Sequence, residues 1–410
     1  MCISYFLFLT SNLRPPTSDL RFPISHFQLP LLCYLEEHQT LRIVKDKTYI
    51  HLRLVWGMLL SWSLLFISFS SCSGKEASNP REAGAVAKTI SASDTVVRPA
   101  DPFFYIDGQL CQHVRRIYQD RSGNLWFGTN VYGLMWYDGD TLRYLDEKDG
   151  ISGGRITAIT EDDKGNVWFG SYQGLTKYDG STFTNYQAED ATISNSIWGI
   201  HIDEKGEFWL GTDEGVVRFD GQEFTVFPIP EIAVADTTTI LSYRRIACVL
   251  KDRDGTLWFG TDGFGICTYD GESFGRITIK DGLPSNNVYD LLEDRHGNIW
   301  IGTMFGGISR FDGESFTNFT EDGVVDGVEA GSFYEDPQGD IWFSAENVGI
   351  YRYDGTTFTQ FDKEDGLNTG GVLAFYQDRE DRFWLGGWGG LFRYDGDSFV
   401  SVTKEGPWEK

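Results

Sequence analysis

Basic residues are too few to balance the acidic ones in this 410-residue chain, which has 35 Lys and Arg against 60 Asp and Glu and a formal net charge of −25. Nucleic-acid binding needs clustered Lys and Arg that contact phosphates, so we expect no nucleic-acid partner. Histidine is also scarce, at six residues, and no Cys/His spacing is typical of a metal site. The sequence therefore predicts neither a metal nor a cofactor.

Cysteine is similarly rare, with six residues in the chain. Beyond Cys72 only Cys111, Cys248 and Cys267 remain, and this odd number does not indicate a disulfide framework. Cys248 and Cys267 fall in predicted strands that are not adjacent. We therefore expect these side chains to pack as small hydrophobic groups.

The apolar run near the N-terminus is shorter than a membrane span requires. The run from Leu54 to Phe69 carries no charge, but at about 16 residues it fits a signal peptide better than a transmembrane helix. Ser70 and Ser71 precede Cys72, and this end of the run resembles a bacterial lipoprotein cleavage box, although Phe69 stands where Leu is usual. The resemblance implies that Cys72 is lipidated and begins the mature protein.

Residues 1–71 are accordingly interpreted as a signal peptide with an N-terminal extension. A signal that begins so far into a chain is unusual, and a start at Val44 would give a compact signal with a basic n-region. An internal membrane anchor with a genuine cytoplasmic tail is the alternative. Residues 72–101 then follow as a lipidated Cys and a flexible tether, because they lack aromatic residues and cannot bury enough surface to fold alone.

Glycine and aromatic residues are abundant, with 47 Gly and 15% aromatics, and they belong to a stretch that is repeated seven times. Its anchor tryptophan recurs as Trp126, Trp168, Trp209, Trp258, Trp300, Trp342 and Trp384. The intervals are 42, 41, 49, 42, 42 and 42 residues. A period of this length, with short apolar runs and Asp-Gly turns, is typical of β-propeller blades. We predict an all-β, seven-bladed β-propeller of four-stranded blades over residues 102–404, with a tail at 405–410.

Each repeat predicts four strands, named A to D. Strand A ends at a turn whose Asp caps local backbone N–H groups and whose Gly, three residues later, supplies a positive φ. In the seventh copy Asp381 replaces this Gly, and the turn should persist because Asp tolerates the left-handed conformation. Strand B contains the anchor Trp, and strand C ends in Asp-Gly, a strong hairpin signal that leads into strand D. The turn aspartates lie one per blade, so they cannot converge on a calcium ion.

The pattern of Asp, Gly, Trp-Ile/Phe-Gly-Thr and Gly-Gly-Leu/Ile resembles the two-component regulator propeller repeat. The resemblance covers residues 103–403 and implies a binding or sensing module, since this repeat is best known from extracytoplasmic sensor regions of bacterial hybrid kinases. The chain carries no kinase region after its last repeat, so direct phosphorelay by this chain alone is not expected.

Two further predictions concern the ring itself. Phe103–Ile106 matches the end of a strand D, and we expect it to pair in the seventh blade and join the two ends of the ring. The extra residues of the 49-residue interval, around 228–243, should form a long D–A loop, because they contain no Trp-Phe-Gly-Thr match.

The residue immediately before strand A differs in every copy: His113, Arg155, Ser196, Arg245, Asn287, Glu329 and Gly371. With strand A innermost, the D–A and B–C loops surround the channel mouth on one face. The B–C loops add Tyr132, Tyr172, Phe264, Phe305 and Trp388, and Trp198 lies one residue inside a strand A. A polar, asymmetric ring with flat aromatics suits a sugar, an aromatic metabolite or a peptide. For any one of these residues an ordinary loop role is the simpler interpretation.

Arg155 and Arg245 form the main positive feature expected on this face. Arg makes bidentate hydrogen bonds to carboxylate, phosphate or sulfate, so the sequence predicts an anionic glycan, peptide or protein as the ligand or partner. We expect a free-standing propeller of the bacterial cell envelope, in contact with the membrane only through its lipid. The alternative is an enzyme similar to the streptogramin lyases, which use a His and a Glu near the channel mouth with a metal. His113 and Glu329 are the matching pair in this chain.

Overall fold

The computed structural model describes residues 42–45, 48–51, 109–231 and 240–409. The chain divides into two units, Met1–Asn79 and Pro80–Lys410. In the first unit β1 (Arg42–Lys45) pairs antiparallel with β2 (Thr48–His51). The predicted lipidation site Cys72, the rest of the predicted signal and the tether lie outside the described residues.

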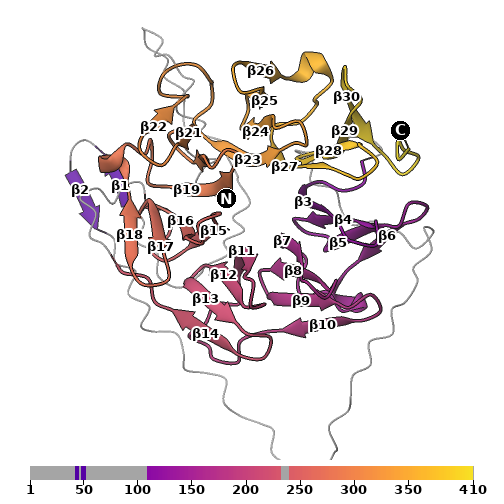
Figure 1. Cartoon of the computed structure of the whole chain (residues 1–410), viewed down its shortest axis with the longest axis horizontal. Coiled ribbons are helices and arrows are strands. Elements are labelled where there is room, and N and C mark those ends of the chain that lie inside the picture. The colour runs from indigo at the N-terminus through magenta and orange to yellow at the C-terminus, as the bar shows by residue number, and fades with distance from the viewer. Residues whose placement is uncertain (1–41, 46–47, 52–108, 232–239, 410) are drawn as a thin grey trace, which may run out of the picture. The chain divides into compact units, whose positions relative to one another are not determined.

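The second unit is a ring of antiparallel sheets (Figure 1). The first three repeats give β3 (Val114–Gln119), β4 (Leu125–Thr129), β5 (Leu134–Tyr137) and β6 (Leu142–Leu145); β7 (Ile156–Glu161), β8 (Val167–Ser171), β9 (Gly174–Tyr178) and β10 (Phe183–Tyr186); and β11 (Ile197–Ile202), β12 (Phe208–Thr212), β13 (Gly215–Phe219) and β14 (Phe224–Phe227). In each repeat the four strands pair in sequence order, so they are the predicted strands A to D.

The remaining repeats continue this order. They give β15 (Ile246–Lys251), β16 (Leu257–Thr261), β17 (Ile266–Tyr269) and β18 (Phe274–Ile277); β19 (Val288–Glu293), β20 (Ile299–Thr303), β21 (Ile308–Phe311) and β22 (Phe316–Asn318); β23 (Ala330–Glu335), β24 (Ile341–Ala345), β25 (Gly349–Tyr353) and β26 (Phe358–Phe361); and β27 (Val372–Gln377), β28 (Phe383–Gly387), β29 (Gly390–Tyr394) and β30 (Phe399–Val402). A single bridge between Thr303 and Ala330 joins the fifth and sixth sets. These seven sets of four strands agree with the predicted all-β propeller.

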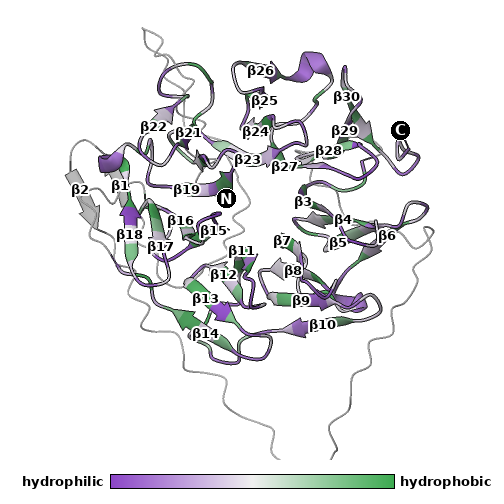
Figure 2. Ribbon diagram, in the orientation of Figure 1, coloured by the Kyte–Doolittle hydropathy of each residue, from purple (hydrophilic) through white to green (hydrophobic). Residues whose placement is uncertain are grey.

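Strand A is the inner strand of every blade. Each strand A contacts the strand A of the next blade, and β27 contacts β3, which closes the ring. The apolar core lies between blades rather than at one centre: each of the seven clusters joins the faces of two neighbouring blades, as Trp126 of the first blade joins Phe169 of the second. Figure 2 shows hydrophobic residues on the strands and mainly hydrophilic residues in the turns.

A hydrogen bond between the anchor Trp and the turn Asp holds the turn between strands A and B, and the sequence pattern does not reveal it. In all seven blades the Trp Nε1 donates to the carboxylate of the turn Asp six residues earlier, at 2.7 to 3.4 Å. The glycines of these turns have positive φ, and Asp381 has φ 60°, so the predicted left-handed turn is confirmed in the seventh copy. The turn aspartates therefore position the anchor tryptophans.

The D–A connections carry short 3₁₀ helices that the sequence analysis did not predict: η1 (Glu147–Asp149), η2 (Ile279–Asp281) and η3 (Lys363–Asp365). Each begins with a capping box, which satisfies the first backbone N–H groups. Between β14 and β15, residues 228–231 and 240–245 form no strand, as expected for a long D–A loop, and 232–239 lie outside the described residues.

The ring closes between the seventh and first blades. The predicted strand Phe103–Ile106 lies outside the described residues, but Gln109 bridges Thr403, directly after the outer strand β30. Further along, the indole of Trp408 stacks on Tyr137 of the first blade, with centroids 4.5 Å apart, and lies 5.8 Å from Trp384 of the seventh. The tail at 405–409 is thus part of the interface between these blades.

Cys111, Cys248 and Cys267 are free cysteines. Cys111 and Cys267 are buried, and Cys248 and Cys267 lie on β15 and β17, the inner and third strands of one blade. Burial raises the pKa of Cys111 to about 12. The predicted packing role is confirmed for the two buried side chains.

Candidate functional site

The candidate site is built on a β-bulge near the start of the inner strands. In six blades the pairing of strands A and B shifts register between the first and third residues of strand A, for example between Ile197 and Gly199, and in the sixth blade it shifts between Gly331 and Tyr334. A bulge bends the strand and re-aims a side chain. Trp198 occupies this position in the third blade, and Arg115 and Tyr289 occupy it in the first and fifth. The sequence pattern singled out Trp198 but not the other two.

Three blades bring their side chains together around Trp198. The ring of Tyr172, in the loop after β8, lies 5.2 Å from the Trp198 ring. The guanidinium of Arg245 lies 4.6 Å from the Trp198 ring, and that of Arg155 lies 5.4 Å from it and 4.4 Å from the ring of Tyr172. These are cation–π distances, so two arginines from different blades share one aromatic surface.

Two carboxylates complete this group, and the sequence analysis missed both. Arg245 donates to Oδ1 of Asp213 and to Oδ2 of Asp262, each at 2.9 Å, and Trp198 Nε1 donates to Oδ1 of Asp213 at 2.8 Å. Both aspartates directly follow the Gly-Thr that ends a strand B, which is the signal that could have found them. We call Arg155, Tyr172, Trp198, Asp213, Arg245 and Asp262 the Trp198 cluster.

The pKa values of the two carboxyl groups in the Trp198 cluster are shifted in opposite directions. Burial raises the pKa of Asp213, but the neighbouring Ser196 hydroxyl and the hydrogen bonds from Arg245 and Trp198 lower it more, so its net pKa lies below the ordinary value. Burial raises the pKa of Asp262 further than Arg245 lowers it. Arg245 therefore forms ion pairs with both aspartates, and the ionised form is favoured at Asp213.

Arg155 differs from Arg245 in its polar contacts. Its Nε is buried, and within the described part of the chain its guanidinium has no hydrogen-bond or ion-pair partner. Burial lowers its pKa, Tyr172 and Asp213 raise it, and Arg245 lowers it. The nearby Arg115 donates from Nε to Asn130 at 2.8 Å, and burial, Arg116 and Arg155 lower its pKa to about 9. Arg155 thus offers unused donors beside a second cation.

The first and seventh blades hold two predicted site residues in the closure of the ring. His113 forms a β-bridge with Trp388, and their rings meet edge to face with centroids 6.0 Å apart. Tyr132 packs against the apolar cluster between these blades. These three side chains have a clear packing role, which was the simpler interpretation of each.

The predicted site residues of the fourth and fifth blades do not come together in one place. Asn287 is fully buried, bridges Asp262, and has no hydrogen-bond partner for its side-chain amide among the described residues. Phe264 lies 6.0 Å from the exposed Tyr243. Phe305 is about half exposed, at 49%. Only Arg155, Trp198, Arg245 and Tyr172 of the predicted set converge in the Trp198 cluster.

Glu329, in the sixth blade, belongs to a pair of carboxyl groups. Burial, a hydrogen bond with Glu346 and the charge of Glu346 raise its pKa to about 8. Deeper in the fifth blade, burial raises the pKa of Asp290 to about 6, and the backbone N–H of Phe333 donates to it at 2.6 Å. Two carboxyl groups on the inner side of the ring thus have pKa values raised above their ordinary values.

Exposed apolar side chains gather on the D–A and B–C loops. Of the large hydrophobic residues that are exposed in the described structure, those on these loops are Val131, Leu241, Tyr243, Ile279, Phe305, Val324 and Val328. The other two, Val226 and Phe274, lie on outer strands. The loops on the side of the Trp198 cluster therefore present more apolar surface than the opposite rim.

The described residues contain no group of three or more His, Cys, Asp or Glu that could hold a metal ion. Nor is any of their helices long and apolar enough to cross a membrane.

The family model described as two component regulator propeller matches residues 108–131, 150–173, 240–263 and 282–305. Four segments of the chain thus match the repeat of this family. No curated protein matches.

Solved structures share the fold. The extracellular domain described as that of a hybrid two component system, BT3049 from B. thetaiotaomicron, is 24% identical with a TM-score of 0.57, over 72% of this chain and 41% of that one. The corresponding domain of BT4673 is 22% identical with a TM-score of 0.54, over 73% and 39%. Virginiamycin B lyase from Staphylococcus aureus is 14% identical with a TM-score of 0.53, over 68% and 93%. The chain thus spans about two fifths of the two extracellular domains.

Proposed function

We propose that this chain is an extracytoplasmic binding module that holds an anionic group of a ligand or partner protein at the Trp198 cluster. The observation that carries the proposal is the contrast between two arginines on one aromatic surface. Arg245 is neutralised by Asp213 and Asp262, whereas Arg155 has no polar partner among the described residues. A partly buried guanidinium with unused donors favours a carboxylate, phosphate or sulfate.

The surroundings of Arg155 favour a ligand with a flat or apolar body. Tyr172 and Trp198 provide the aromatic surface, and the exposed apolar loop residues extend the same side of the ring. Anionic glycans and peptides combine these features. A protein surface also presents anionic groups beside apolar ones. A partner protein with an acidic loop is therefore the third candidate ligand.

The module acts in sensing or interaction, in line with the extracellular two-component domains that share its fold. We further propose that it is attached to the cell envelope through a lipid on Cys72. The lyase-like alternative stays a prediction: its pair, His113 and Glu329, lies on the first and sixth blades, and Glu329 is engaged with Glu346.

A thermal-shift screen of the full chain against sulfated and carboxylated glycans and acidic peptides tests the proposal. A ligand that raises the melting temperature of the parent should lose this effect in Arg155→Ala. Arg121→Ala is the matched control, because Arg121 is exposed on the opposite rim, where it pairs with Glu161. If Arg155→Ala and Arg121→Ala respond to the ligand like the parent, the Trp198 cluster is not the site.

A further inference from the structure

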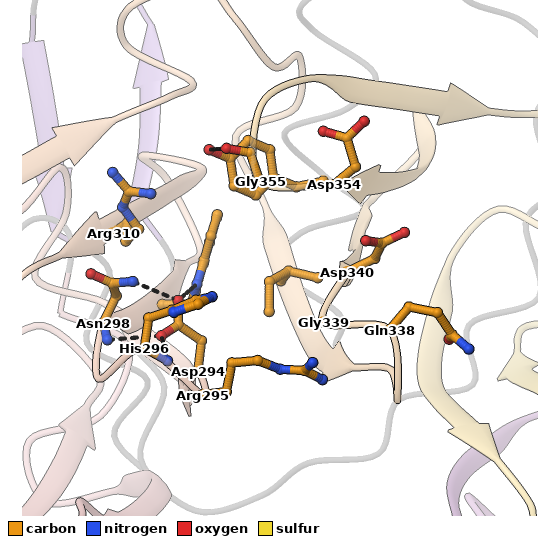
Figure 3. A pocket seen from close by; sticks show the side chains of 13 residues that line it. Asp294, Arg295, His296, Asn298, Arg310, Gln338, Gly339, Asp340, Asp354 and Gly355 are labelled. Atoms are coloured by element: carbon orange, nitrogen blue, oxygen red, sulfur yellow. Dashed lines mark hydrogen bonds between the residues drawn. The ribbon is translucent and has the colours of Figure 1, made fainter.

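A groove separates the fifth and sixth blades on the rim opposite to the Trp198 cluster (Figure 3). Its volume is about 510 Å³. His296, Asn298 and Arg310 line the wall of the fifth blade, and Asp340 and Asp354 line that of the sixth. Asp294 and Arg295 also line the wall of the fifth blade, so this wall holds two guanidinium groups and a carboxylate, whereas the wall of the sixth holds two carboxylates.

The corresponding groove between the seventh and first blades is filled by the chain's own tail. Nη1 of Arg393 donates to the carbonyl oxygens of Pro407, at 3.4 Å, and of Glu409. Nη1 of Arg382 donates to the carbonyl oxygen of Trp408 at 2.8 Å. Two guanidinium groups thus hold three successive main-chain carbonyls of an extended segment.

The two grooves are built from matching residues. Arg310 pairs with Trp300 across strands B and C, as Arg393 pairs with Trp384. Tyr353 ends strand C of the sixth blade and donates its hydroxyl hydrogen to the carbonyl of Gly355. Tyr137 in the first blade does the same with Gly139. Arg393 and Tyr137, which contact the tail in the filled groove, therefore have counterparts in the open one, whereas Asn298 stands at the position of Arg382.

Arg310 differs from the arginines at the same position of other blades. Arg218 pairs with Glu207, Arg352 pairs with Asp340 at 3.6 Å, and Arg393 holds the tail. Within the described ranges Arg310 has neither a hydrogen bond nor an ion pair; its Nε is buried, and its guanidinium lies 6.0 Å from the ring of Trp300. A donor set that is used in the filled groove is thus unused in the open one.

One difference defines what the open groove accepts. Phe319 stacks on Trp300 at 5.5 Å, and Tyr353 lies 5.4 Å from Trp300, so no space for an indole remains between them. In the seventh blade Val402 occupies the position of Phe319, and Trp408 enters there. The open groove can receive a main chain with small side chains, but not a buried Trp.

We propose that the groove between the fifth and sixth blades binds an extended peptide segment of a partner protein, whose main-chain carbonyls accept hydrogen bonds from Arg310. Asp354 on the facing wall favours a segment that also carries a basic side chain. This site is separate from the Trp198 cluster and does not depend on the function proposed for it.

The test uses the full chain and fluorescein-labelled heptapeptides in an anisotropy titration. The peptide KEGPGEK, which has the tail sequence of residues 404–410 with Gly in place of Trp, should bind the parent saturably. Arg310→Ala should weaken binding roughly tenfold, the loss expected when a charged hydrogen-bond donor is removed. The matched control Arg218→Ala, which changes a groove whose Arg is already paired, should leave affinity unchanged.

A second variant tests the shape of the groove. Phe319→Val recreates the arrangement of the seventh blade, so it should bind KEGPWEK more tightly than the parent does, and Arg310→Ala should abolish this gain. Failure of the parent to bind KEGPGEK, equal affinity in Arg310→Ala, or absence of a gain in Phe319→Val would each overturn the proposal. It is also overturned if Arg393→Ala rather than Arg310→Ala removes binding, because the peptide would then be replacing the tail.

Discussion

Nε1 of Trp300 donates a hydrogen bond of 3.0 Å to Oδ2 of Asp294, so the anchor of the fifth blade is tied to the turn that precedes its strand. Asn298 contacts the same carboxylate at 2.7 Å. Because Trp300 is 1% exposed, this bond fixes the orientation of a large side chain within the interface between two blades. The turn and the core are thereby one structural unit.

Replacement of this anchor should therefore destabilise the ring. Trp300→Ala is expected to lower the free energy of unfolding by about 3–5 kcal/mol, because it removes a buried aromatic group and leaves a cavity. Urea unfolding followed by circular dichroism measures this change. Val226→Ala, at an exposed position on an outer strand, is the control and should cost roughly 0.5 kcal/mol or less. Equal unfolding midpoints for the two variants would contradict this prediction.

The two arginines of the Trp198 cluster should differ in their effect on stability. Arg245→Ala leaves the buried carboxylate of Asp262 without its partner and should cost about 1–3 kcal/mol, since Arg245 itself is partly exposed. Arg155→Ala breaks no hydrogen bond with a described residue and should change stability by roughly 0.5 kcal/mol or less. Thermal unfolding of the two single variants tests this order, and a larger loss in Arg155→Ala would refute it.

The contribution of Glu329 to stability should decrease as the pH rises. Its pKa rises from the ordinary value of 4.5 to about 8 in the folded protein, so folding favours the protonated form. Its contribution is fully present below pH 4.5 and is lost as the pH rises toward 8. Melting temperatures between these values should thus decline less with pH in Glu329→Gln than in the parent. An identical pH dependence of the two proteins would rule out this role.

Asp294, the turn aspartate of the fifth blade, acts in the opposite direction. Burial raises the pKa of Asp294, but hydrogen bonds from Asn298, Trp300 and the backbone lower it more, so its folded pKa is below the ordinary value. This contribution is present at neutral pH and is lost on acidification through the folded pKa. Asp294→Asn should therefore reduce the loss of stability that the parent shows in acid, as measured by urea unfolding at a series of acidic pH values. Parallel curves for the variant and the parent would be inconsistent with this effect.

Trp408 should contribute to closure of the ring. Trp408→Ala removes the stack on Tyr137 and is expected to cost about 1–3 kcal/mol, less than a fully buried Trp because the side chain is half-buried. Hydrogen exchange should report faster exchange in β5 and β28 than in the corresponding strands of the third blade. Uniform acceleration in all blades would instead indicate a global loss of stability.

Processing at Cys72 is a separate prediction. The mature protein should begin at this residue, carry lipid on it, and partition into the detergent phase of a Triton X-114 extraction. Cys72→Ser should move the protein to the aqueous phase. An intact peptide across Ser71 and Cys72 in the mass spectrum of the mature protein would show that no cleavage occurs there.

The repeat pattern was enough to predict the propeller, because period and turn chemistry are local properties of the sequence. The spacing of Trp300 and Asp294 was visible, but their hydrogen bond depends on how the turn folds back over the strand. Similarly, the bulge that re-aims Trp198 is a register shift between two strands, and no residue type marks it. The sequence analysis thus assigned Arg155, Tyr172 and Arg245 to the loops on which the structure places them.

Other parts of the site could not be predicted from single positions. Asp213 and Asp262 follow the same Gly-Thr motif as ordinary loop residues, and only contact with Arg245 distinguishes them. Asn287 was expected at a polar surface, but the B–C loop of the preceding blade covers it. Burial by a neighbouring repeat depends on the tertiary structure, which a pattern within one repeat does not contain.

The position of Trp408 has a consequence for the order of folding. The first blade contributes Phe127 and Tyr137 to an interface that also needs Trp384 and Trp408, which lie more than two hundred residues later in the chain. During synthesis the second to sixth blades can pack against their neighbours as they emerge, whereas the first blade keeps one apolar face uncovered. That face remains a candidate surface for chaperones until the last repeat arrives, so an arrested chain should be the most aggregation-prone form of this protein.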